Sequence, residues 1–531
     1  MKKTFKTTLT ALVAIALTIL SSCSSKDMLD MVPSDVDFVA VGNPDQLIKN
    51  AGFEITDTDI KGPSELKAIL NSIPNQTRDV ITDLHSSIDF NRIVVMGYIA
   101  AEPEVVVLVK LTDKDKVRST IRSYRQAERF TIKGYDVYEL DPRTCLVVDG
   151  SYGYFCSSRS TDDAASLVNK FLHRAKDKDI TSVSSVAKVI SEDRTLNIAC
   201  NMTPLADLLS SSAYALVDAQ SAMALSATVP YLKGNWLSLS ANYEGTSLTV
   251  ESFLFNEESG DRVEYPGTKE IDSNTLRLLP SNTIAAAACG IDNQQLRNQL
   301  NQLQGLTNSD PLAKELVKQL GNLDGTVAVG IGLNNKEQLA DAMVHGFQNL
   351  DMTLVAQMVP GKAADLKTTL TNLASLSSGI KIENNGNVTS LTDGKLTYHL
   401  FTEGNNFVIS KSSSVKESDN NIIPLMKDAS SAIAVNVPSV SALIGGNSKL
   451  GLESSLVFED SKLTFKISLT GVDKDNLYSS LMSLGAEIQS FANSVWSSAY
   501  SNDYYNSYNN YDEYAIVDSA EEYAYVDSIA Y

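Results

Sequence analysis

A short unit of apolar and polar positions recurs along the chain. Four to seven apolar or β-branched residues predict a strand, a capping residue such as Asn or Thr follows, and leucines then recur at helical spacing, as in residues 43–47 and 203–208. Residues 244–245 and 459–460 separate alternating strands and indicate hairpins. This mixture predicts an α+β fold with a largely antiparallel sheet and helices packed on one face.

The order of these patterns occurs twice. Five segments of the first half match five of the second in the same order: 32–45 with 279–292, 105–124 with 353–370, 134–157 with 394–410, 198–202 with 433–437, and 243–250 with 458–465. Five collinear matches indicate an internal duplication. We therefore expect two tandem copies of one domain, residues 32–270 and 271–495.

The N-terminus has the pattern of an export signal. Lys2 and Lys3 precede an apolar stretch, residues 11–20, which is too short to stay in a bilayer as a permanent helix. The chain then reads Leu-Ser-Ser-Cys, ending at Cys23, which resembles the lipobox of bacterial lipoproteins. That resemblance implies a signal peptide over residues 1–22, an acylated Cys23 and a tether over residues 23–31. The alternative is a plain secreted protein with Cys23 at the cleavage site by chance.

After this signal the mature chain opens with Val-Pro-Ser-Asp-Val-Asp-Phe-Val-Ala-Val, residues 32–41. With the lipobox and the overall length, this opening resembles the long outer-membrane lipoproteins of the Bacteroidota that are grouped as a domain of unknown function. The resemblance implies a lipid-anchored location in the cell envelope, on the periplasmic or the surface side. It assigns no functional residue, because that family has no established activity.

Composition limits the classes of partner. The chain has 43% hydrophobic and 20% charged residues, which is typical of a globular protein, and a formal net charge of −20. Such a charge repels nucleic acid, so no nucleic-acid partner is expected. The expected partners are the membrane, through the lipid anchor, and an envelope protein or a glycan.

Local motifs for catalysis or metal binding are not found in the sequence. The four histidines are far apart in the chain and form no zinc-binding spacing. Residues 57–62 open like a calcium loop, but Ala68 occupies the position of the required glutamate. No nucleophile, phosphate-binding or dinucleotide signature occurs. We therefore expect no metal, no cofactor and no catalytic residue.

The cysteines after Cys23 are predicted to be structural. In the duplication Cys156 aligns with Ile409, Cys200 with Val435 and Cys289 with Gly42, so these positions accept small or apolar side chains. Cys145 and Cys156 would face each other if a hairpin turns near residue 150. An exported location permits a disulfide between these two.

A basic stripe is the main candidate for binding. Its arginines recur every three or four residues and would lie along one side of a helix: Arg118, Arg122, Arg125 and Arg129. The stripe would suit an acidic partner, an acidic glycan or a lipopolysaccharide phosphate. The alternative is a solvated helix face whose arginines pair with nearby acids: Asp113, Asp115 or Glu128.

The last segment, residues 496–531, is rich in Tyr, Asn, Ser and Asp, which predicts a disordered tail with aromatic side chains for contact. Together these features favour a non-catalytic, membrane-anchored binding or scaffold protein of the envelope. Two alternatives remain. One is an envelope hydrolase whose residues are dispersed over loops, and the other is a glycan-capture lipoprotein.

Overall fold

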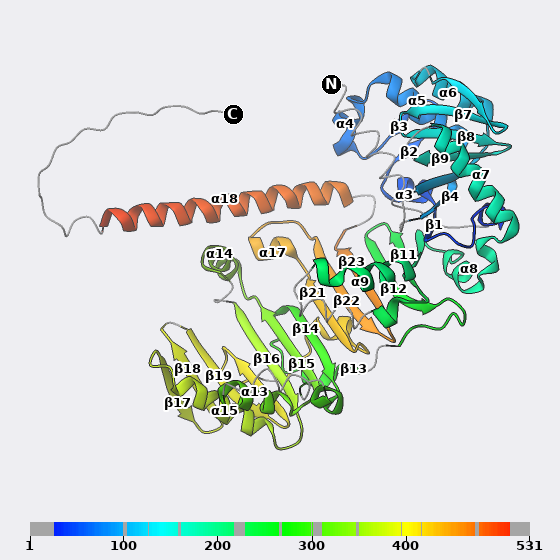
Figure 1. Ribbon diagram of the computed structural model, residues 1–531. Helices are drawn as coiled ribbons and strands as arrows, with labels where there is room; N and C mark the ends of the chain where they lie inside the picture. The colour runs from blue at the N-terminus through cyan, green and yellow to red at the C-terminus, as the bar shows by residue number, and fades with distance from the viewer. Residues whose placement is uncertain are drawn as a thin grey trace, which may run out of the picture.

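A computed structural model describes residues 26–98, 104–125, 127–157, 161–216, 229–264, 268–298, 300, 311–346, 350–394, 396–415, 417–472 and 477–509. Within them, one antiparallel sheet of 21 strands runs through the molecule, and helices lie around it (Figure 1). The predicted α+β class with a largely antiparallel sheet is confirmed. None of the described helices is both long and apolar enough to cross a membrane.

The first half begins before the predicted boundary at residue 32 and ends with a long hairpin. Its elements are α2 (Lys26–Leu29), β1 (Phe38–Gly42), α3 (Pro44–Asn50), β2 (Glu54–Ile55), β3 (Ile60–Lys61), α4 (Lys67–Asn71), α5 (Asn75–Ser87), β4 (Ile88–Tyr98), β5 (Glu104–Leu111), α6 (Lys114–Arg125), β6 (Arg129–Ile132), β7 (Tyr135–Asp141), β8 (Thr144–Asp149), β9 (Tyr152–Ser157), α7 (Thr161–Asp177), α8 (Ser184–Ile190), β10 (Leu196–Asn201), α9 (Thr203–Leu216), β11 (Asn235–Glu244) and β12 (Ser247–Asn256). The strands pair in the order β12-β11-β10-β1-β4-β5-β9-β8-β7-β6.

The second half has its own long hairpin and a terminal helix. Its elements are β13 (Thr268–Lys269), α11 (Ser273–Leu276), β14 (Thr283–Ile291), α13 (Pro311–Leu320), β15 (Leu323–Gly332), α14 (Lys336–His345), β16 (Asp351–Met358), α15 (Ala363–Ser375), β17 (Ile380–Asn385), β18 (Val388–Asp393), β19 (Leu396–Glu403), β20 (Asn406–Ser410), α16 (Ile423–Met426), β21 (Ser431–Val437), α17 (Val440–Ile444), β22 (Gly451–Glu459), β23 (Lys462–Thr470) and α18 (Leu477–Asn509). Apart from the short β13, the order β23-β22-β21-β14-β15-β16-β20-β19-β18-β17 repeats that of the first half position by position.

A β-bulge also recurs at the same place. The β4–β5 pairing shifts between Asp89 and Ile93, and the β15–β16 pairing shifts between Leu323 and Val327. Strands β12 and β23 pair with each other and so join the two halves into one sheet. The long hairpins that close the halves therefore meet in its middle.

The ladders show which aligned residues are equivalent. Ala40 faces Ile198 in the first half, and Ala287 faces Ile433 in the second, as the alignment of these segments requires. The aligned segments 105–111 and 154–157 are displaced by one residue. As a result, Cys156 is equivalent to Ser410 and not to Ile409.

Helices cover both faces of the sheet, so the expectation of one covered face is wrong. In the first half, Val94 packs in a core that includes α7 and α8, whereas its neighbour Val95 packs in a core that includes α6. Successive strand residues point to opposite faces. A strand buried on both sides reads as a continuous apolar run, and β4 and β5 have such runs.

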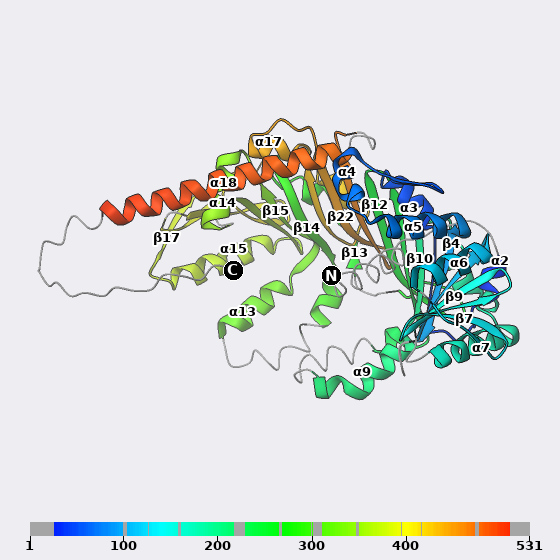
Figure 2. The same ribbon diagram turned by 90° about the horizontal axis from the view of Figure 1, so that it is seen from above.

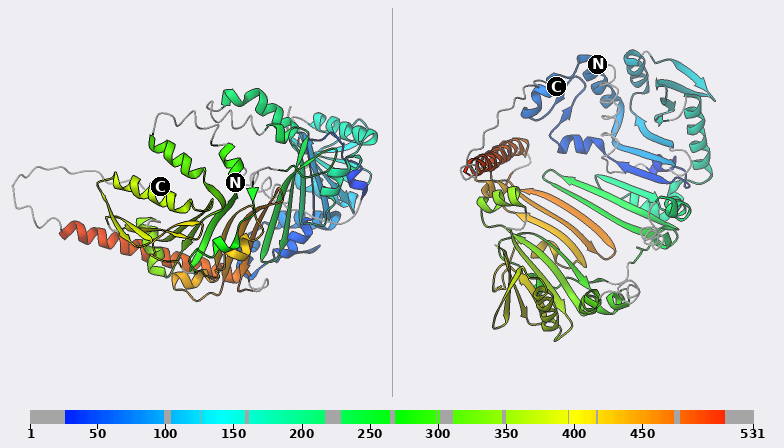
Figure 3. Two further views of the ribbon diagram at one scale, coloured as in Figure 1. Left: turned by 90° about the horizontal axis from the view of Figure 1, so that it is seen from below. Right: turned by 60° about the vertical axis from the view of Figure 1, so that its left-hand side comes forward.

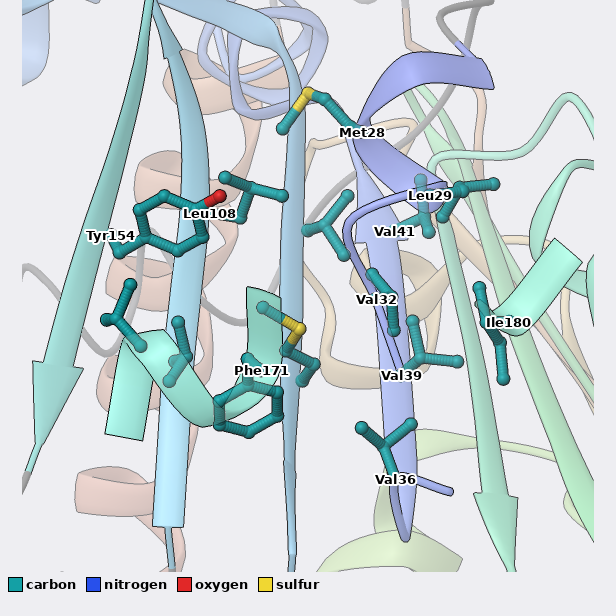
Figure 4. Close-up of a cluster of buried hydrophobic side chains, with 14 of the residues drawn as sticks. Met28, Leu29, Val32, Val36, Val39, Val41, Leu108, Tyr154, Phe171 and Ile180 are labelled. Atoms are coloured by element: carbon teal, nitrogen blue, oxygen red, sulfur yellow. The ribbon is translucent and has the colours of Figure 1, made fainter. Parts of the chain in front are cut away.

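The segment 23–31, predicted as a tether, is part of the folded body from residue 26 onward. Met28 and Leu29 are 1% and 3% exposed and pack in the core of the first half with Val32, Val41 and Ile180 (Figure 4). The Val32 carbonyl accepts a hydrogen bond from the Ile180 amide, 2.8 Å away. Their burial makes Met28 and Leu29 part of the core and not of a tether.

At the other end, α18 runs along α14 and α17 (Figure 2). It begins at Leu477 and ends at Asn509, so residues 496–509 are helical where disorder was predicted. Apolar residues at helical spacing, Leu484 and Val495, are buried in this helix. Residues 510–531 of the predicted tail, and Cys23 with the signal peptide, lie outside the described residues.

Candidate functional site

The predicted basic stripe does not lie on one helix. Arg118 and Arg122 are on α6, which ends at Arg125, whereas Arg129 begins strand β6. The side chain of Arg125 lies outside the described part of the chain. The spacing of the arginines predicted a helix that extends to residue 129, one turn beyond its actual end. Arg129 has the same spacing as the other arginines but belongs to the β6–β7 hairpin.

Asp136 on β7 organises this region. Arg118 donates to Asp136 at 2.8 Å and to Asp115 at 3.0 Å, and the Nε of Arg129 donates to Asp136 at 2.9 Å. The hydrogen bond and charge of Asp136 raise the pKa of the Arg129 guanidinium. Two of the arginines are thus engaged by one carboxylate that sequence analysis did not single out. The one feature of the sequence that could have indicated Asp136 is its position on β7, which pairs with β6, the strand of Arg129, in a hairpin.

Among the stripe arginines whose side chains the structure describes, Arg122 is exposed and is the one not bound to Asp136. Its guanidinium lies 5.8 Å from the ring centroid of Tyr138, in a cation–π contact. Arg122, Ser119 and Ser123 line a shallow hollow beside the Asp136 pairs. Three guanidinium groups against the carboxylates of Asp115 and Asp136 leave one net positive charge there. That arrangement can hold one anionic group at the surface.

Cys145 and Cys156 are directly opposite each other in the β8–β9 hairpin, as the turn at residue 150 predicts. They are both buried free thiols, so the predicted disulfide is not formed. The Cys156 thiol donates to the Tyr154 carbonyl oxygen at 3.5 Å and is also hydrogen-bonded to the Cys145 thiol. Burial, with the adjacent Cys145 thiol, raises the pKa of Cys156 and keeps it protonated.

The equivalent position of the second half carries a polar row. Thr353 and Ser410 share a hydrogen bond of 2.9 Å, His399 lies opposite Ser410, and the Ser390 hydroxyl lies 2.9 Å from Nδ1 of His399. A serine beside a histidine is the minimum for nucleophilic catalysis, which also requires a group that orients the histidine. Among the described residues, only Ser390 is hydrogen-bonded to the His399 ring.

A second hollow lies between α14, α17 and α18. Its central carboxylate, Glu487, accepts hydrogen bonds from the Ser441 hydroxyl, from the Asn447 amide at 3.1 Å and from the Ser448 amide at 3.2 Å. These bonds, that of Ser441 first, lower the pKa of Glu487. The carboxylate fastens α18 to the loop after α17, which is a structural role. Sequence gave no indication of it, because its partners are backbone amides 39 and 40 residues away.

Metal binding finds no support in the described residues, which contain no group of three His, Cys, Asp or Glu side chains that could hold an ion. The site residues predicted from the sequence fall into two groups. Arg118, Arg122 and Arg129 are brought together around Asp136, whereas Cys145 and Cys156 are adjacent but buried away from any ligand.

No family model matches the chain, and no curated protein matches it. Among solved structures, the one named "Structure of crystal form III of TP0453" is 9% identical, covers 46% of this chain and 84% of that chain, and has a TM-score of 0.28. Crystal form IV of the same protein is 12% identical, with coverage of 42% and 79% and a TM-score of 0.26. Similarity at this level supports no conclusion about fold or function.

Proposed function

We propose that this protein is a lipid-anchored lipoprotein of the bacterial cell envelope and acts as a non-catalytic binding or scaffold protein. The observation that carries the proposal is the N-terminal sequence: a cationic start, a short apolar stretch and Leu-Ser-Ser-Cys ending at Cys23. The resemblance to outer-membrane lipoproteins of the Bacteroidota supports the same location.

The polar clusters of the body favour a binding or scaffold role over catalysis. Asp136 binds two arginines, Glu487 binds backbone amides, and His399 has a serine without an orienting carboxylate among the described residues. Each of these groups stabilises local structure. The hollow beside Arg122 is the place where an anionic group of an envelope protein or glycan would bind.

The repeated strand order supports the further proposal that the two halves descend from one duplicated domain. The equivalent bulges at Asp89–Ile93 and Leu323–Val327 add to that support, since bulges persist within protein families. A scaffold role suits this architecture, because joining two domains edge to edge gives one extended surface.

The anchor is tested by replacing Cys23 with serine. We expect the variant to lose fatty-acid label and to leave the membrane fraction, because acyl chains contribute about 0.8 kcal/mol per buried methylene. Cys289→Ser is the matched control: it changes a half-exposed cysteine of the body and should leave label and location unchanged. Label and membrane location retained by Cys23→Ser would refute the lipoprotein assignment.

A further inference from the structure

One face of the middle of the sheet is apolar from one half to the other. A single row crosses six strands, each residue directly opposite the next: Ala241, Val250, Phe465, Leu456, Ile433 and Ala287. In the adjacent rows between β11 and β22, the polar side chains on this face are Ser252, Ser454 and Tyr243. We call this surface, built on β11, β12, β23, β22, β21 and β14, the apolar floor.

The corresponding row of the opposite face is polar on four of the six strands, where it contains Asn242, Thr249, Lys466 and Ser455. On β21 and β14 it continues as Ala434 and Ala286, which are buried in the core of the second half. A strand with one apolar and one polar face is typical of a sheet that covers something on its apolar side. On β11, β12, β23 and β22 the alternation therefore marks the apolar floor as a contact surface.

The apolar floor is open to solvent in part, because four residues of the row are half-buried: Ala241, Val250, Phe465 and Leu456. Ile433 is 55% exposed and Leu463 is 40% exposed. Among the described elements, α6 packs on this face over the first-half sheet, and α14, α15 and α17 pack on it over the second-half sheet. The right-hand view of Figure 3 shows the central strands with no helix drawn across them.

We propose that the apolar floor binds an acyl chain of a membrane phospholipid. The floor carries no charge along the row, and its backbone groups are paired in the ladders, so it offers an occupant apolar contact and almost no hydrogen bonding. Sugars and extended peptides need such polar partners, and an acyl chain does not.

The dimensions agree with this occupant. Six strands at about 4.8 Å spacing give a floor about 24 Å long. Each leaflet contributes half of a hydrocarbon core about 30 Å thick, so one lipid tail fits along the row. The proposal rests on the proposed function for the source of the lipid, because a membrane-anchored body has phospholipid within reach.

The test uses the full-length Cys23→Ser protein, purified without detergent, and equilibrium dialysis with labelled palmitoyl lysophosphatidylcholine below its micelle concentration. We expect saturable binding of one molecule per chain. Removing methylenes from the probe should weaken binding by up to about fourfold each, the factor equivalent to about 0.8 kcal/mol. Absence of saturable binding, or affinity independent of chain length, would overturn the proposal.

Two variants locate the site, and one controls for charge. Ile433→Lys and Leu463→Lys place a cation on the exposed floor and should each weaken binding at least tenfold, with unchanged far-UV circular dichroism. Thr464→Lys adds the same charge to the opposite face of β23 and should bind like the parent. Equal binding by the floor variants overturns the proposal. So does a dimer that Ile433→Lys dissociates, since a second copy would then cover the floor.

These results are separable from the anchor test. A Cys23→Ser protein that remains on membranes contradicts the lipoprotein assignment, whereas dialysis of the same protein still reports whether the apolar floor takes a lipid tail.

Discussion

The two halves share a strand order but fill it differently. At equivalent positions of one face, the first half has Val41 and Val94 where the second half has Ala288 and Ala328. The first half also places α7 on this face, with Phe171 fully buried, whereas the described residues between β20 and α16 of the second half contain no helix. Strand order therefore depends on pattern and turns, while the volume of the core can vary.

One cross-strand row shows the same contrast in polarity. In the first half it contains large apolar or thiol side chains: Val39, Met96, Val106, Cys156 and Cys145. In the second half it contains small or polar ones: Ala286, Gly330, Thr353, Ser410 and His399. The larger side chains lie where more helices cover them. We therefore expect the first half to be the more stable.

The largest expected effect is in the core beneath α7. Phe171→Ala removes a fully buried ring and should lower the free energy of unfolding by about 3–5 kcal/mol. Hydrogen exchange should show the loss in the first half, because α7 packs only there. Leu208→Ala, at a 55% exposed position, is the control and should change stability by less than about 0.5 kcal/mol. Equal acceleration of exchange in both halves would mean that they unfold as one unit.

The next largest effect is expected at the β12–β23 pairing that joins the two halves, which we call the seam. Lys462 on β23 donates to Glu251 on β12 at 2.6 Å, and Arg194 lies 3.0 Å from the same carboxylate. Lys462→Met should cost about 1–3 kcal/mol, since it leaves a half-buried carboxylate with fewer partners. Lys49→Met breaks an exposed pair with Asp45 and should cost about 0.5 kcal/mol or less. Chemical denaturation measures both.

The seam should also weaken in acid. Burial pushes the pKa of Glu251 up, but the hydrogen bond and charge of Lys462, with Arg194 and Arg262, outweigh it and lower that pKa. A carboxylate with a lowered folded pKa stabilises the fold fully above its unfolded pKa, near 4.3, and loses this contribution as pH falls through the folded value. Lys462→Met should therefore flatten the loss of stability below about pH 4. If stability falls with pH in the same way in the parent and in Lys462→Met, Glu251 is not the cause of the loss of stability in acid.

The smallest expected effects are in the group of Arg118, Arg122 and Arg129, which only the first half has. They distinguish arginines that bind a ligand from arginines that stabilise the fold. Arg118→Ala breaks pairs with Asp115 and Asp136 and should lower stability by about 1 kcal/mol. Arg122→Ala should change stability by less than about 0.5 kcal/mol and reduce salt-sensitive capture of anionic envelope components. Capture that survives Arg122→Ala, or is lost only with Arg118→Ala, would assign these arginines to structure.

Local signals in the sequence predicted the hairpins, and collinear matches predicted the shared strand order. The register shifts in β4–β5 and β15–β16 were not predictable, because they leave no compositional mark. The one-residue error at Cys156 was a misalignment of two apolar strands whose neighbouring residues are similar. Of the candidate site, the grouping of Arg118 with Arg122 was predicted from helical spacing. Asp136 and Glu487 were missed, since their partners come from other elements and from backbone amides.

The burial of Met28 fixes how freely the body can turn at a membrane. If Cys23 is acylated as proposed, four residues lie between the anchor and Met28, and the five Cα–Cα steps reach at most about 17 Å when fully extended. Helix α18, with 33 residues, is alone about 50 Å long. The segment from Cys23 to Met28 is much shorter than the folded body, so it would restrict rotation of the body at the membrane. The first half would stay next to the bilayer, and the far end of the second half would project away from it. The molecule would thus have a near side and a far side set by the burial of Met28.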